Sequence, residues 1–201
     1  MTLPGIDPRR TALLVMDYQG GILSRLGTAE SLLASAADAI AVVRGHGGQI
    51  GYVRVAFEDA DYDAVPPHSR FASLLATGRV AMHSDSPGTA IHDSVAPKPG
   101  DITVRKTRVG AFSTTDLDQQ LRDRGITTLI LAGISTSGVV LSTVRDAADR
   151  DYQVFVLADG CADPGPGVHE FLTETIFPRQ ARVITSAELK DVLSGPGDVE
   201  G

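Results

Sequence analysis

The chain has 201 residues, 42% hydrophobic and 21% charged, and this length and composition predict one soluble globular domain. Its formal net charge of -7 disfavours nonspecific binding to nucleic acid or to an anionic membrane surface. We expect a cytoplasmic protein without a transmembrane helix, because no apolar run approaches about 18 residues, no signal-peptide layout is present and Cys161 is the single cysteine.

Apolar runs alternate with helical patterns along the chain. Six runs predict β-strands, at residues 11–17, 49–57, 101–106, 127–132, 153–158 and 181–185. Five segments with helical spacing of apolar residues lie between or after them, at residues 30–46, 115–124, 139–149, 168–176 and 187–193. The alternation predicts an α/β fold, a three-layer α/β/α sandwich whose parallel sheet of five to six strands carries helices on both faces. We expect this domain to span residues 1–193 and a flexible tail to follow at residues 194–201.

The first predicted strand, Thr11–Asp17, ends on a carboxylate. Open parallel sheets place their ligand sites at the C-terminal ends of the strands, so Asp17 is a candidate site residue. An aspartate in this place also suits a cap of the following turn, and the residues alone leave both interpretations open. Arg54 and Phe57, near the end of the second strand, are candidates for the wall of the same pocket.

The segment after the second strand is first acidic and then rich in proline. Residues 58–63 read EDADYD and are followed by a lone His68, which predicts a solvated acidic loop rather than a metal site. The stretch Pro66–Pro99 is the least regular third of the chain. Long connections often form lids or subunit contacts, so we expect it to take part in self-association.

Lys106 ends the third predicted strand, and Arg108 and Phe112 follow it closely. A lysine in this place is by default a surface residue. Its functional interpretation depends on the motifs around it.

Residues 126–152 carry the most informative pattern of the chain. The apolar run Thr127–Ala132 leads into the small residues Gly133–Gly138, and a helical pattern follows over Val139–Asp149. Glycine permits a sharp turn and the close approach of a ligand. A strand that turns tightly into a helix presents free backbone N–H groups, so the pattern predicts a site for an anion or a developing oxyanion.

These motifs together resemble the isochorismatase-like hydrolases, also called cysteine hydrolases, over residues 11–193. The corresponding loop of that family reads approximately G-x-x-T-x-x-C-V-x-x-T-x-R-D-A, matched here by Gly133, Thr136, Val140, Thr143, Arg145, Asp146 and Ala147. Val139 stands at the position of the family's nucleophilic cysteine. The D-x-Q pattern of the family is matched by Asp17 and Gln19, and its lysine followed by an aromatic residue by Lys106 and Phe112.

The resemblance implies a role for each matched position. Asp17 would be the acid/base residue and Lys106 would support charge beside residue 139, the catalytic position that Val139 fills. The expected substrate-binding residues are Gln19, Arg54, Phe57, Arg108, Phe112, Ile134, Ser135 and Gly138. The resemblance also implies a cis peptide bond at Ile134–Ser135, a small-molecule substrate, and a homodimer or homotetramer. We expect no cofactor, and no metal because the chain has no Cys/His pairs at metal-ligand spacing.

Valine cannot attack a carbonyl carbon, so residue 139 cannot form an acyl-enzyme. Cys161 is not a replacement, because it lies one strand later than the nucleophile's position. The isochorismatases proper, as the resemblance implies, cleave a vinyl ether without a thiol: an aspartate protonates the enol-pyruvyl group and water captures the oxocarbenium ion. Such an aspartate must keep its proton near neutral pH, which burial favours and Lys106 opposes.

The sequence therefore predicts a hydrolase that uses Asp17 and Lys106 for acid/base chemistry on a small anionic metabolite, for instance hydrolysis of an isochorismate-type vinyl ether. Arg54, Arg108 and Lys106 are the cations expected to receive its carboxylates. Two alternatives stay open. One is a non-catalytic member that binds a small ligand or a partner, and the other is a lyase or isomerase of secondary metabolism that reuses the same pair.

Overall fold

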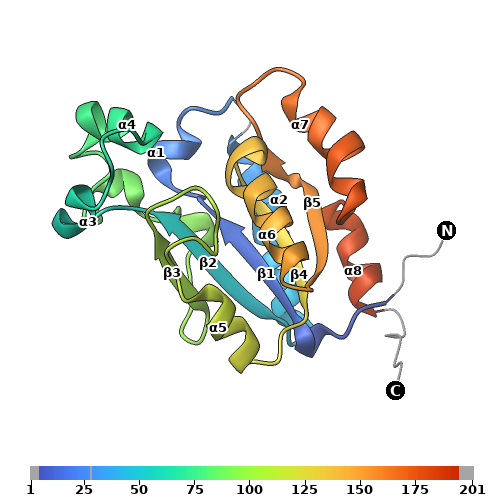
Figure 1. Ribbon diagram of the computed structural model, residues 1–201. Coiled ribbons are helices and arrows are strands. Elements are labelled where there is room, and N and C mark those ends of the chain that lie inside the picture. Colours follow the sequence, from blue (N-terminus) through green and yellow to red (C-terminus); the bar gives the residue numbers. More distant parts are fainter. Residues whose placement is uncertain (1–4, 28, 195–201) are drawn as a thin grey trace.

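The computed structural model describes residues 5–27 and 29–194, so the predicted tail lies outside these residues except for Ser194. Six strands form one parallel sheet in the order β3-β2-β1-β4-β5-β6 (Figure 1). They are β1 (Thr11–Met16), β2 (Gln49–Val55), β3 (Ile102–Lys106), β4 (Thr128–Ile134), β5 (Gln153–Ala162) and β6 (Arg182–Ile184). The predicted parallel α/β sheet is confirmed.

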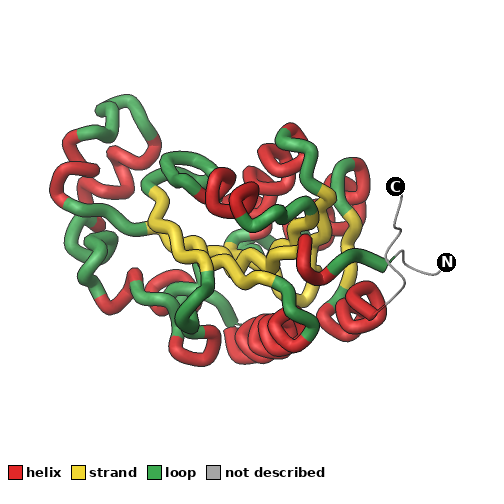
Figure 2. The backbone as a smooth tube through the Cα atoms, turned by 90° about the horizontal axis from the view of Figure 1, so that it is seen from below, coloured by secondary structure: helices red, strands yellow, loops and turns green. Residues whose placement is uncertain are grey.

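Helices cover both faces of the sheet, which lies between them as a middle layer in Figure 2. One face carries α2 (Ala29–Gly45) and α8 (Ser186–Ser194), and the other carries α5 (Leu117–Asp123), α6 (Leu141–Asp149) and α7 (Val168–Phe171) with the π-helical turn Leu172–Ile176. Strand β1 shows why both layers form. Leu13 and Val15 point into the cluster under α2, whereas Leu14 and Met16 point into the cluster under α6. A strand buried on both faces reads as a continuous apolar run.

The order of the strands fixes where a ligand can bind. After β1 the chain adds β2 and β3 on one side and then crosses to β4 on the other side of β1. A crevice at the carboxyl ends of the strands is expected at such a reversal. Asp17 directly follows β1 there with a φ of 60°, a conformation that aspartate tolerates better than most residues. Its neighbour Met16 pairs with Gly133 of β4, which brings Asp17 beside the Gly133–Gly138 loop.

The segment between β2 and β3 is more regular than its sequence predicts. Helices α3 (Asp59–Asp63) and α4 (Arg70–Gly78) lie beyond the end of β2 in Figure 1, near α1 (Gly20–Leu23). The expectation of an acidic loop at residues 58–63 is wrong, because Asp61 Oδ2 accepts a hydrogen bond from Glu58 N at 2.8 Å and begins a helix. Asp61 also pairs with Arg105. No group of three or more His, Cys, Asp or Glu in residues 5–27 and 29–194 is placed to hold a metal ion.

Within the described part of the chain, no helix is long and apolar enough to cross a bilayer.

Gly51 allows β2 to lie against β1 without a clash. A Cβ atom at Gly51 would lie 2.7 Å from Leu14 Cδ2, its register partner in β1. Gly51→Ala is therefore expected to lower the free energy of unfolding by about 1–3 kcal/mol in urea denaturation, because a well-packed core resists an added methyl group. The matched control is Gly45→Ala at the end of α2, where nothing lies within 4 Å of the added atom. That variant should be unchanged or slightly more stable, and an equal loss in both variants would contradict the packing argument.

Candidate active site

A cavity of about 320 Å³ opens at the carboxyl ends of the central strands. Its inner end is formed by the residues that end or follow four strands, Asp17, Val55, Lys106 and Ile134. Its outer walls come from α1, from α4, from residues 81–89 and from Arg108 and Val109 after β3. The cavity therefore lies at the reversal of strand order described above.

Asp17 and Lys106 form a buried ion pair at the inner end of this cavity. Lys106 Nζ lies 2.7 Å from Asp17 Oδ2, and the two side chains are only 2% and 6% exposed. The same ammonium group donates a second hydrogen bond, of 2.6 Å, to the carbonyl oxygen of Val109. Lys106 is paired in register with Val55 of β2, so its side chain reaches across the end of β2 to the residue after β1.

The second oxygen of the Asp17 carboxyl group is left without a partner. Asp17 Oδ1 is buried and forms no hydrogen bond with any described residue. Burial raises the pKa of Asp17 from 3.8 to about 6, although the Lys106 cation acts in the opposite direction. The site thus combines one oxygen held by a cation with one that is free for a proton or a ligand.

The loop after β4 forms another part of the cavity wall. Its peptide bond Ile134–Ser135 is cis, which confirms the conformation implied by the resemblance. A π-helical turn, Thr136–Val140, then leads into α6. Two side chains hold this turn in place, since Asp163 Oδ2 accepts from Ser137 N at 2.7 Å and Thr136 Oγ1 lies 2.9 Å from His169 Nδ1.

Four residues of this loop face the cavity. They are Ile134, Ser135, Gly138 and Val139, and Val139 is almost fully buried beside them. A side chain at residue 138 would place its Cβ 2.7 Å from Ser135 Oγ, so glycine there leaves room for the serine hydroxyl. The positions of Ile134, Ser135, Gly138 and Val139 agree with those expected from sequence, and their roles remain predictions.

Gln19 also lines the cavity, but its amide group is fully engaged with the backbone. Nε2 donates to the carbonyl oxygens of Val55 at 2.9 Å and Thr89 at 2.8 Å, and Oε1 accepts from Val55 N at 2.9 Å. This residue therefore joins the end of β2 to the segment at residue 89. These hydrogen bonds position the cavity wall, and the expected contact of Gln19 with substrate remains a prediction.

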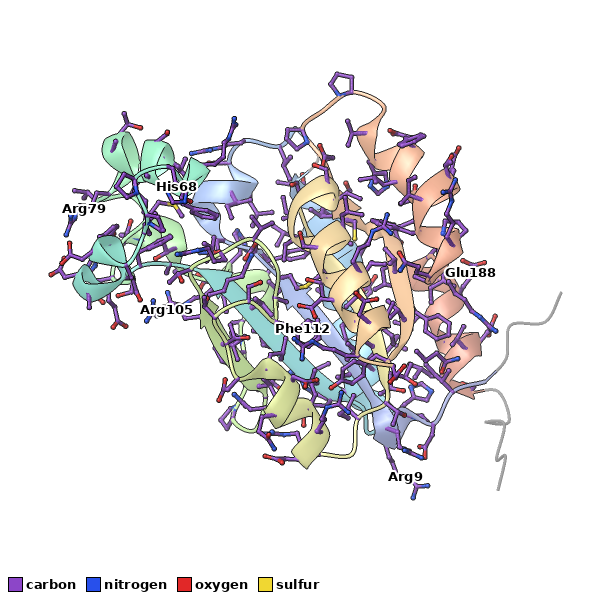
Figure 3. The ribbon with its side chains drawn as sticks, in the orientation of Figure 1. Arg9, His68, Arg79, Arg105, Phe112 and Glu188 are labelled. Carbon is purple, nitrogen blue, oxygen red and sulfur yellow. The ribbon has the colours of Figure 1, made fainter. Side chains whose placement is uncertain are left out.

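Three of the expected substrate-binding residues do not line the cavity. Arg54 donates to the carbonyl oxygens of Ser84 and Thr89 instead. Phe57 is fully buried in the cluster under α4, with its ring centroid 5.5 Å from that of Tyr62. Phe112 stacks on Tyr152 in the core at 6.1 Å, and Figure 3 places it away from the strand ends. Proximity to a strand end in sequence did not determine which way these side chains point.

The cavity includes residues that the sequence did not single out. Arg25, an exposed residue in the connection after α1, reaches the rim. Arg108 lies there too, and its predicted contact with substrate remains a prediction. Phe71 and Met82 add an apolar wall from the segment after β2. A lone arginine in a polar connection carries no motif, and neighbouring prolines mask the helical pattern of α4, so neither had a usable signal.

Cys161 lies outside the cavity. It is buried in β5, where its Sγ lies 3.9 Å from the carbonyl oxygen of Leu131. Burial raises the pKa of this thiol to about 12, which keeps it protonated at neutral pH. Since the chain has no other cysteine, no thiol faces the Asp17–Lys106 pair.

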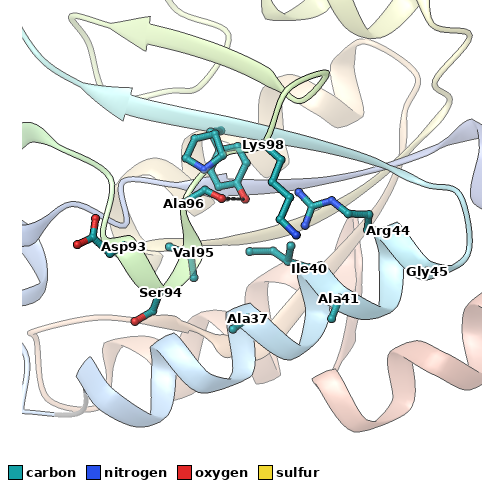
Figure 4. Close-up of a pocket in the computed structure, with 12 residues that line it drawn as sticks. Ala37, Ile40, Ala41, Arg44, Gly45, Asp93, Ser94, Val95, Ala96 and Lys98 are labelled. Atoms are coloured by element: carbon teal, nitrogen blue, oxygen red, sulfur yellow. Dashed lines mark hydrogen bonds between the residues drawn. The ribbon is translucent and has the colours of Figure 1, made fainter.

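A larger groove of about 660 Å³ lies elsewhere, between α2 and residues 93–98 (Figure 4). Arg44 and Lys98 extend into it, and Tyr52 is among the other residues that line it. Arg44 Nη2 is already paired with Asp101 Oδ2 at 2.8 Å. The groove contains no paired acid and base comparable to Asp17 and Lys106, so the smaller cavity is the candidate active site.

Comparisons with known proteins identify the family of this chain. The family model of the isochorismatase domain matches residues 11–188. The chain is 35% identical over 188 residues to the uncharacterized isochorismatase family protein YwoC of Bacillus subtilis, covering 94% of this chain and 96% of that protein. It is also 35% identical over 181 residues to the ureidoacrylate amidohydrolase RutB of Methylobacterium radiotolerans, covering 80% of this chain and 70% of that protein.

A solved structure shares the fold over almost the whole chain. The isochorismatase family protein from Burkholderia thailandensis superposes with a TM-score of 0.80 at 29% identity, covering 95% of this chain and 98% of that one. The family match, the relatives and the shared fold lead to the same assignment: this chain belongs to the isochorismatase family of hydrolases.

Proposed function

We propose that this protein is a hydrolase that works without a thiol, with Asp17 as general acid and Lys106 as its charge partner, on a small anionic metabolite. An isochorismate-type vinyl ether is the reference substrate. The observation that carries the proposal is the Asp17 carboxyl group, whose Oδ2 is held by Lys106 while its buried Oδ1 lacks a partner at the cavity. Burial raises its pKa to about 6, so a proton remains available close to neutral pH.

The reaction requires one proton and one water molecule. Asp17 donates its proton to the terminal carbon of the vinyl ether, and the double-bond electrons form that C–H bond, leaving an oxocarbenium ion. Water adds to the cationic carbon and loses a proton to the Asp17 carboxylate. The resulting hemiketal breaks its C–O bond to give a ketone and an alcohol. Asp17 thus ends each cycle in its starting protonation state.

Lys106 supports both halves of this cycle. Its ammonium group stabilises the Asp17 carboxylate that forms once the proton has left, at a distance of 2.7 Å. Burial disfavours the same carboxylate, so the two effects together keep the acid strong enough to donate and weak enough to be reprotonated. Neither residue has to form a covalent bond with the substrate.

A thiol-dependent amidase is less well supported, although the RutB relative is an amidohydrolase by name. That chemistry needs a nucleophile beside the acid and the lysine. The wall of the cavity offers the methyl groups of Val139 there, and Cys161 is buried elsewhere with its thiol protonated.

The charge of the cavity supports an anionic substrate. Arg25 and Arg108 lie on its rim, and Asp17 is the only acidic residue among the described residues that line it. Arginine side chains bind carboxylates through paired hydrogen bonds. From the family resemblance and the single cysteine we also propose a cytoplasmic homodimer or homotetramer that acts in secondary metabolism.

The test is a product analysis in heavy-oxygen water. Isochorismate and a panel of amides and esters are supplied to the protein, and any ketone is reduced as it forms because free ketones exchange oxygen with water. Hydrolysis places one solvent oxygen in the product. A product without added water would instead indicate a lyase or isomerase, and tight binding without any product would indicate a non-catalytic member.

The pH dependence of turnover separates an acid from a base. If Asp17 acts as the acid, kcat/KM should be constant below its pKa and fall about tenfold per pH unit above about 6. The sign follows because only the protonated carboxyl group can donate. Initial rates between pH 4.5 and pH 8.5 measure the profile. A rate that rises through the same pH would show that the carboxylate acts as a base, and would refute the acid role.

A further inference from the structure

The outer part of the active-site cavity is predominantly apolar. Ile22 of α1, Phe71 and Leu74 of α4, Met82 and Val109 form it, whereas the ion pair lies at the inner end. Leu74 is 45% exposed and Val109 is 42% exposed, and they come from separate segments of the chain. Only four large hydrophobic residues of the described chain are exposed, and two of them line this one cavity. Exposed apolar side chains concentrated around a cavity mark a place where a ligand binds.

The apolar wall is held in place from behind. The Phe71 ring lies 6.0 Å from the Phe57 ring, which in turn stacks on Tyr62 at 5.5 Å. The carbonyl oxygen of Met82 accepts a hydrogen bond of 2.9 Å from Phe57 N. The wall is therefore formed before any ligand arrives, and binding requires little reorganisation of these side chains.

The volume of the cavity limits what can occupy it. An apolar cavity of about 150 Å³ is enough for one benzene ring. A cavity of about 320 Å³ has room for one ring or branched chain together with a polar group. The cations Arg25 and Arg108 lie on the rim. The cavity therefore suits an amphipathic anion better than a uniformly polar one.

We propose that the substrate carries an aromatic or branched apolar body, which packs against Phe71, Leu74 and Val109, and a carboxylate that the rim arginines bind. Leu74 and Val109 determine this specificity, because each presents an exposed apolar side chain to the cavity from a separate segment of the chain. The inference rests on the proposed function only in assigning the reacting group to the Asp17 end. The proposed substrate differs in its apolar body from ureidoacrylate, the polar acid in the name of the RutB relative.

The experiment compares two anions of the same charge and similar size. Phenylacetate has an apolar body and 3-ureidopropionate a polar one. Their affinities for the full chain are measured by NMR titration at pH 7.5. Phenylacetate is expected to bind at least about tenfold more tightly, since burying a phenyl group is strongly favourable. Leu74→Asn and Val109→Asn should each weaken the binding of phenylacetate by about three- to tenfold and change the affinity for 3-ureidopropionate by less than about twofold.

Val80→Asn is the matched control. Val80 is 86% exposed and does not line the cavity, so the same change there should leave both affinities unaltered. Equal or tighter binding of 3-ureidopropionate, or no measurable binding of either anion, would overturn the proposal. So would Asn variants that keep phenylacetate affinity but change the oligomeric state in light scattering, because Leu74 and Val109 would then form a subunit contact. Binding of phenylacetate needs no turnover, so this result is independent of the acid role of Asp17.

Discussion

Asp17→Asn is expected to lower kcat/KM by about 10²- to 10⁴-fold, the range that a positioned general acid contributes. Asparagine keeps the size of the side chain and one oxygen for the Lys106 ammonium group, 2.7 Å away in the wild type. It removes only the titratable proton. Steady-state kinetics on the substrate identified in heavy-oxygen water would measure the loss, and the fall in rate above pH 6 should disappear from what activity remains.

Two controls make this result specific. Phenylacetate affinity should be retained in Asp17→Asn, because the apolar wall and the rim arginines are unchanged. Asp59→Asn removes a carboxylate from α3, where Asp59 is exposed and pairs only with Arg79 among the described residues, and it should leave turnover unaltered. Full activity in Asp17→Asn would exclude this residue as the acid.

Lys106→Met is expected to lower the free energy of unfolding by about 3–5 kcal/mol at pH 8, because it leaves a buried carboxylate without its cation. The carbonyl oxygen of Val109 also loses the hydrogen bond it accepts from Lys106 Nζ. Methionine nearly fills the same volume, so the loss reports charge and hydrogen bonding more than packing. Urea denaturation at several pH values measures it.

The pH dependence of this loss has a definite sign. In the wild type the folded-state pKa of Asp17 is raised to about 6, so its contribution to stability is complete below the unfolded pKa and is lost as the pH rises through 6. Without Lys106 the folded pKa moves higher, and the loss continues beyond pH 6. The difference between variant and wild type should therefore grow from pH 6 to pH 8.

An equal difference at pH 5 and pH 8 would show that the Lys106→Met effect is not electrostatic. Lys98→Met provides the control, because Lys98 is an exposed lysine outside the sheet core and should change stability little at either pH. The double variant with Asp17→Asn should recover part of the stability, since the uncompensated carboxylate is then absent.

The strands and the helices that cover them could be predicted because a strand buried on both faces of the sheet has a continuous apolar sequence. Strand β1 is a continuous apolar run, and each of its six residues is buried. Strand β5 is longer than predicted, because Cys161 pairs with Gly133 of β4 beyond an irregularity in register and Asp159 interrupts the apolar pattern. Helix α4 was missed because prolines precede a short apolar repeat.

A site residue could be predicted only where its position at the end of a strand determined the direction of its side chain. Asp17 and Lys106 meet because both lie at carboxyl ends of strands that share a sheet. Phe112 is an aromatic residue at the expected distance along the chain, yet its ring packs on Tyr152 because the core there accepts it. Arg25 reaches the cavity through the path of a loop. Such paths depend on long-range packing that local patterns do not encode.

The hydrogen bonds of Gln19 indicate how the substrate specificity of this fold could be changed. Asp17, the proposed proton donor, directly follows a strand of the sheet, whereas much of the apolar wall belongs to the segment between β2 and β3. This segment could therefore be exchanged by grafting, with the chemistry retained, provided that the graft keeps one anchor. That anchor is the carbonyl oxygen of Thr89, which accepts a hydrogen bond from Gln19 Nε2 at 2.8 Å. This bond would hold a grafted wall at the same position relative to Asp17.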